Sequence, residues 1–140
     1  MIKNKKHIDR TMNKDTKLLR DKVMNIINEA RYDRGYDLPF IKVRITDTAE
    51  GYNNVLGSAR MGGNWIWIPA NSTHRNDLVA IVLHELLHTV FSTPHKKGCP
   101  LMDAVAQGCS DEDAWNVFDH YYNLPHRNLK RAFSTELSWF

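Results

Sequence analysis

The feature that most constrains this chain is the sequence His-Glu-Leu-Leu-His at residues 84–88, inside an apolar stretch from Ala80 to Phe91. An apolar run of this length, with almost no charge on any side, is typical of a buried helix. Positions four apart share one face of a helix, so His84 and His88 can reach the same metal ion. Polar side chains on a buried helix need partners, because leaving them unpaired costs several kcal/mol.

The chemistry of these residue types favours zinc. Zinc binds neutral imidazole nitrogen at about 2.0–2.1 Å, and catalytic zinc sites keep one position open for water or substrate. Glu85 is adjacent to His84, where a carboxylate can take a proton from water activated by the metal. The alternative is that the two histidines form the polar edge of an amphipathic helix, which the uncharged flanking residues disfavour. The sequence therefore predicts His84 and His88 as metal ligands and Glu85 as the catalytic residue.

Length and composition indicate one ordinary globular domain. The chain has 140 residues, of which 42% are hydrophobic and 25% are charged, and its formal net charge is +3. The positive residues concentrate within residues 1–22 and 127–131, a pattern typical of a solvated surface rather than of nucleic-acid binding. We therefore expect a single domain over residues 1–140, with residues 1–12 as a loose lead-in and no nucleic-acid partner.

The expected location is the cytoplasm. The sequence has no apolar run of about 18 residues, so we expect no membrane partner. No apolar segment follows the basic N-terminus, so no secretory signal is expected. Cys99 and Cys109 should then be free thiols, although their spacing leaves their redox state and role open. The small size fits a phage or mobile-element product as well as a housekeeping one.

The hydrophobic pattern predicts an α+β fold. Helical spacing covers residues 15–36, strand-like segments cover 40–45, 55–61 and 65–68, and the apolar helix covers about 75–91. Gly62-Gly63-Asn64 separates the second and third strands, which predicts a hairpin. Residues 92–109 look irregular, and Ser110 followed by three acidic residues predicts the start of a last helix. A short helical turn is expected around residues 129–133.

A catalytic zinc needs a third protein ligand. His95 is the nearest candidate, seven residues after His88 and directly after Pro94, which turns the chain. The alternative is an acidic residue on the later helix, as in gluzincin-type peptidases that resemble thermolysin, and Glu112 would be that residue.

At this point the chain resembles the metzincins, and among them the matrixins, whose pattern is H-E-x-x-H-x-x-G-x-x-H followed by a methionine turn. Here His84, Glu85, His88 and His95 are followed by Met102, seven residues after His95. Two departures stand out. Phe91 occupies the position of the family's glycine, which normally turns the chain with positive φ, and His95 arrives one residue late. An extra residue together with Pro94 could make the turn without that glycine.

The resemblance implies a small twisted mixed sheet packed against an N-terminal helix and the active-site helix, with a C-terminal helix after the methionine turn. It implies a zinc endopeptidase in which Met102 forms an apolar floor beneath the metal. A peptide or protein substrate would pair with an exposed edge strand at Leu56, Gly57, Ser58 and Ala59. No structural calcium is expected, because the Asp/Gly-rich loops of matrixins are not evident. The alternatives are a gluzincin-type peptidase or zinc amidase, or a metzincin-like binding module without catalytic activity.

Overall fold

The computed structural model describes residues 16–46, 55–124 and 136–139. In chain order, the described elements are a helix over residues 16–28 that continues as the π-helical turn η1 (Glu29–Asp33), then β1 (Lys42–Thr46), β2 (Gly57–Arg60), β3 (Trp65–Pro69), the 3₁₀ turn η3 (Ala70–Ser72), α2 (Leu78–Phe91), α3 (Asp111–Tyr122) and β4 (Glu136–Trp139). The α+β class is confirmed. No helix among these residues is both long and apolar enough to cross a membrane.

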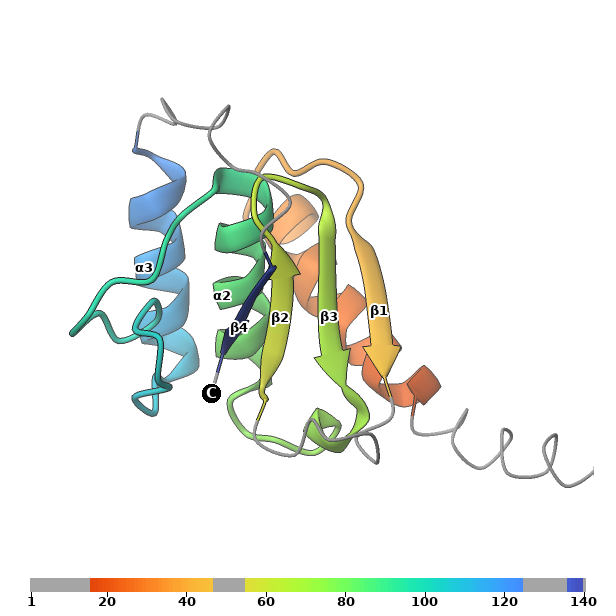
Figure 1. The fold of residues 1–140 in the computed structure, drawn as a ribbon. Coiled ribbons are helices and arrows are strands. Elements are labelled where there is room, and N and C mark those ends of the chain that lie inside the picture. Colours follow the sequence, from red (N-terminus) through yellow and green to blue (C-terminus); the bar gives the residue numbers. More distant parts are fainter. Residues whose placement is uncertain (1–15, 47–54, 125–135, 140) are drawn as a thin grey trace, which may run out of the picture.

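The strands form one mixed sheet in the order β1-β3-β2-β4 (Figure 1). β1 pairs with β3 in parallel, whereas β2 is antiparallel to both β3 and β4. The predicted hairpin of β2 and β3 is confirmed, with Gly62 at φ 67° in its turn. Positive φ carries little cost for glycine, which explains its presence there.

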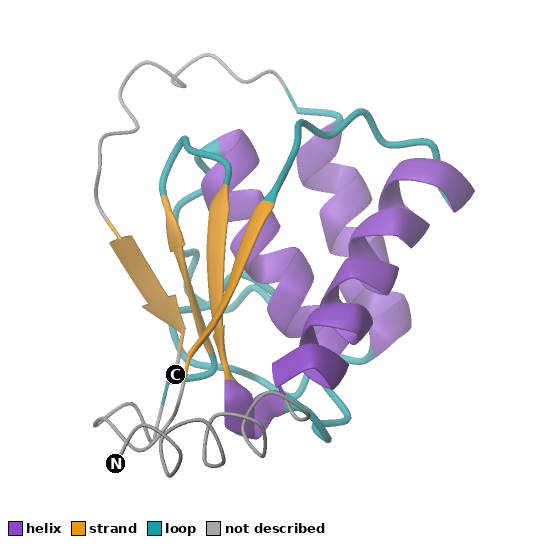
Figure 2. Cartoon of the chain, turned by 90° about the vertical axis from the view of Figure 1, so that its right-hand side faces the viewer, coloured by secondary structure: helices purple, strands orange, loops and turns teal. Residues whose placement is uncertain are grey.

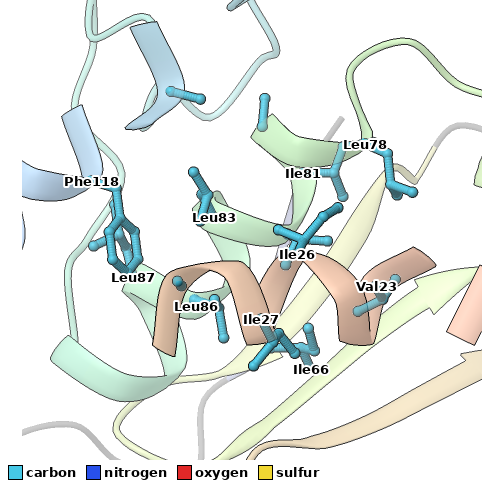
Figure 3. Packing of buried hydrophobic residues seen from close by; sticks show 14 of the residues in the cluster. Val23, Ile26, Ile27, Ile66, Leu78, Ile81, Leu83, Leu86, Leu87 and Phe118 are labelled. Carbon is cyan, nitrogen blue, oxygen red and sulfur yellow. The ribbon is translucent and has the colours of Figure 1, made fainter. Parts of the chain in front are cut away.

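The helices lie on one side of the sheet, and the core lies between them and the strands (Figure 2). Ile27 of the first helix, Ile66 of β3 and Ile81 of α2 have no exposed surface, and Figure 3 shows them among the clustered core side chains. Burying one such side chain contributes about 1.5–3 kcal/mol. This packing holds α2 firmly between the sheet and α3.

The two predicted C-terminal features differ in outcome. The last helix is confirmed, since Ser110 Oγ accepts a hydrogen bond from the backbone N–H of Asp113 at 3.2 Å and caps α3. The helical turn expected around residues 129–133 lies outside the described residues. Instead, residues 136–139 form β4, which the sequence pattern did not predict.

β2 is not an edge strand among the described strands, so the expectation of an exposed edge at Gly57, Ser58 and Ala59 is wrong. β4 pairs with β2 on the side away from β3. The physical reason is that a strand can satisfy its outer N–H and C=O groups with any suitable extended segment, however distant in sequence. Leu56 precedes the strand and is half-buried. Peptide binding at these residues stays a prediction.

Candidate metal centre

Three histidines converge at the C-terminal half of α2. His84 and His88 come from the helix, with no exposed surface, and His95 comes from the segment that follows it. The ring nitrogens that could bind a metal all lie within 4.8 Å of one another. The structure thus brings the three predicted ligands together. Glu112, the alternative third ligand, is exposed on the first turn of α3 and is not part of this group.

Backbone carbonyls fix the tautomers of the two helical histidines. Nδ1 of His84 lies 2.6 Å from the carbonyl oxygen of Leu101, and Nδ1 of His88 lies 2.5 Å from that of Thr93. A carbonyl oxygen only accepts hydrogen bonds, so both Nδ1 atoms must carry the proton. Both Nε2 atoms then present lone pairs, which is the form in which imidazole binds a metal.

These two Nε2 atoms face each other at 3.0 Å. With both Nδ1 atoms protonated there is no proton between the Nε2 atoms, so the contact joins two lone pairs. Such a contact is repulsive unless a cation lies against both nitrogens. Two ligands at 2.0–2.1 Å in a tetrahedral zinc site are about 3.3 Å apart, close to the observed separation. The donor set therefore fits zinc.

The surroundings keep the histidines neutral. Burial lowers the pKa of His88 from 6.5 to about 4 and holds the pKa of His84 well below 6.5. Burial also lowers the pKa of His95, while the nearby Asp103 carboxylate acts in the opposite direction. Nε2 of His95 is buried and has no hydrogen-bond partner. Neutral imidazoles with available nitrogens need no deprotonation before binding a metal at neutral pH.

The turn after α2 explains how His95 reaches the other two ligands. The helix extends through Phe91, and Ser92 adopts the left-handed conformation at φ 55°. The N–H of Ser92 donates to the carbonyl of His88 at 3.2 Å, and that of Thr93 donates to the carbonyl of Leu87 at 3.0 Å. The turn that the family pattern places at Phe91 thus lies one residue later, which matches the late position of His95.

Replacing Ser92 with glycine is expected to stabilise the chain by about 1 kcal/mol, because a side chain in the left-handed region costs roughly 1–2 kcal/mol. Urea unfolding measures this change. The matched control is Phe91→Gly, which should destabilise the chain because Phe91 is helical and packs against the core. If Ser92→Gly destabilised the chain and Phe91→Gly stabilised it, the left-handed turn would lie at Phe91.

Glu85 directly follows His84 on α2 and is fully enclosed. It has no exposed surface, and neither carboxylate oxygen has a hydrogen-bond partner. Burial raises its pKa well above 4.5. A Cβ atom added at Gly57 would lie 2.8 Å from Oε2 of Glu85, so β2 approaches the carboxylate closely because Gly57 has no side chain. An unpartnered buried carboxyl of this kind is typical of a functional group rather than a structural one.

The segment that follows His95 contains Met102, the residue predicted to lie beneath the metal. Met102 is fully buried, and its carbonyl accepts a hydrogen bond from the N–H of Lys96 at 2.7 Å. The N–H of Met102 contacts Sγ of Cys99 at 3.4 Å. Cys99 and Cys109 are both free thiols, and burial raises the pKa of Cys109 to about 11. The role of Met102 as a floor beneath a metal stays a prediction.

Sequence reasoning missed the carbonyls of Thr93 and Leu101, which hold the histidine rings. Backbone acceptors have no residue signature, so no signal in the sequence could have found them. The layout of the ligands resembles that of the metzincins, with the third histidine displaced by one residue. Comparison of the chain with protein families, curated proteins and solved structures finds no match, so this resemblance stays a prediction.

Proposed function

We propose that the protein is a zinc-dependent endopeptidase. The observation that carries the proposal is the 3.0 Å approach of the Nε2 atoms of His84 and His88, with a ring nitrogen of His95 within 4.8 Å of them and Glu85 next to His84 in the chain. A purely structural zinc site has no use for a buried, unpartnered carboxyl next to the ligands. The presence of Glu85 therefore favours catalysis.

His84, His88 and His95 would hold the zinc, with the carbonyls of Leu101 and Thr93 fixing two of the rings. A bound zinc ion would supply a Lewis acid for activating water and polarising the scissile carbonyl. Glu85 takes the proton from the attacking water and delivers it to the leaving amine nitrogen. Burial raises the pKa of Glu85 in the metal-free chain, and the positive charge of a bound zinc ion would lower that pKa again, so that the ionised carboxylate can accept the proton near neutral pH.

The test is the zinc content per chain, measured by native mass spectrometry on the wild type and on His95→Ala. About one zinc ion is expected in the wild type, with loss in the variant, because three protein ligands define a catalytic site. His74→Ala is the matched control, since His74 is exposed, and it should keep the zinc. Cleavage of a peptide library by the zinc-loaded wild type completes the test.

Each other outcome is informative. No zinc in the wild type after zinc-replete purification would overturn the proposal. Zinc in both the wild type and His95→Ala would show that the third ligand is another residue. Zinc without peptide cleavage would leave a metal-binding module or an amidase acting on another substrate.

A further inference from the structure

The strand β4 occupies the side of β2 that a binding peptide would need. The two strands are antiparallel, with Gly57 opposite Trp139 and Arg60 opposite Glu136. In Figure 1 β4 lies along β2 on the side away from β3. Since β3 holds the other side of β2, an extended peptide can pair with β2 only where β4 now lies.

β2 also lies against the candidate general base. Gly57 lies against Glu85, so near that a Cβ atom there would be 2.8 Å from Oε2. The register places Trp139 opposite this same glycine. Residues 136–139 therefore run along the strand that forms one wall of the site.

The burial of the site supports the same conclusion. His84, Glu85 and His88 have no exposed surface. A scissile carbonyl must come within about 3 Å of the reacting groups, and the enclosed Glu85 offers no surface to a peptide in this arrangement of the chain. Release of β4 would free one side of β2 while leaving the β1-β3-β2 sheet and α2 in place.

We propose that residues 136–139 are an intramolecular competitor for peptides at β2. Extended peptides bind sheet edges by adding a strand, and the backbone hydrogen bonds that hold them are largely independent of sequence. β4 is such a strand supplied by the chain itself. The identification of the competing peptides as substrates rests on the proposed peptidase function, whereas the competition itself does not.

The pairing is weak enough to be reversible. β4 has four residues, and each backbone hydrogen bond contributes a net 0.5–1.5 kcal/mol, roughly, to stability. An added peptide must compete with a segment of the same molecule, which needs no bimolecular encounter to pair with β2. The full-length chain should therefore bind peptides poorly until β4 is weakened.

The test compares the affinities of full-length variants for a fluorescent synthetic peptide that copies residues 134–140. The N–H groups of adjacent strand residues point to opposite sides, so Leu137→Pro/Ser138→Pro removes whichever donor faces β2. The control Leu137→Val/Ser138→Thr keeps both donors and favours an extended strand. Binding is measured with a chelator present, so that the readout needs no zinc and the peptide is not cleaved.

The proline variant is expected to bind the peptide at least tenfold more tightly than the wild type, and the control no more tightly than the wild type. Equal affinities, or no binding by a proline variant that circular dichroism shows to be folded, would overturn the inference. If the proline variant does not fold, Leu137→Gly/Ser138→Gly takes its place with the same expected direction. Absence of zinc from the wild type would overturn the peptidase proposal without changing this binding result.

Discussion

A Glu85→Gln chain is expected to keep about one zinc ion and to hydrolyse peptides about 10²–10⁴-fold more slowly than the wild type. The amide has nearly the shape of the carboxyl but cannot accept the proton of the attacking water. The three histidines, whose nitrogens form the metal group, are unchanged. The loss should therefore appear in kcat, measured with a peptide selected from the library, while mass spectrometry reports the retained zinc.

Glu112→Gln is the matched control for this prediction. Glu112 is exposed on α3 and is not part of the metal group, so its amide variant should keep both zinc and activity. Full activity in Glu85→Gln would show that another group takes the proton. Loss of zinc in Glu85→Gln would show that the carboxyl supports the metal centre rather than the chemistry.

The parts of the fold that depend on local pattern could be predicted from the sequence. The buried helix α2 followed from an apolar run, and the capped start of α3 followed from Ser110 and the three acids after it. The i, i+4 spacing of His84 and His88 fixes their common face once the helix exists. Convergence of His95 was predicted from its position after Pro94 and from the resemblance, but the position of the turn at Ser92 was not.

What could not be predicted depends on contacts between distant segments. β4 has only four residues, too few for alternation to stand out, and its partner strand lies more than seventy positions earlier in the chain. The prediction that β2 is an exposed edge strand was wrong because this distant segment pairs with it. The close approach of Gly57 to Glu85 is likewise a tertiary contact, visible in the sequence only as a glycine in a strand.

Chelating the zinc is expected to lower the unfolding temperature by about 10 °C at neutral pH. A ligand that binds only the folded chain, present at about 1,000 times its dissociation constant, adds about 4.1 kcal/mol of stability. For a chain of this size each kcal/mol shifts the unfolding temperature by about 2–4 °C. Differential scanning fluorimetry with and without chelator measures the shift, and His88→Ala should show none.

The zinc-free chain should then be most stable near pH 6.5. The pKa of His88 is about 4 and those of His84 and His95 are also lowered, all from 6.5. Between these values the unfolded chain binds more protons than the folded chain, so the free energy of unfolding rises with pH. The raised pKa of Glu85 acts oppositely above pH 4.5, because the folded chain keeps a proton that the unfolded chain releases. The three lowered histidine pKa values outweigh the one raised carboxyl pKa below pH 6.5, and above it Glu85 is the group of this centre that contributes.

Urea unfolding in the presence of chelator at about pH 5.5, 6.5 and 8 measures how the free energy of unfolding depends on pH. Each proton by which the folded and unfolded chains differ changes this free energy by about 1.4 kcal/mol per pH unit. In Glu85→Gln the free energy of unfolding should still rise with pH below pH 6.5, but it should no longer fall above pH 6.5. The reason is that no other group at the centre has a raised pKa. A free energy of unfolding that rises through pH 8 in the wild type would mean that Glu85 is ionised in the folded chain. The carboxyl would then need a cationic partner that the described residues do not supply, or its enclosed position would have to be open to water.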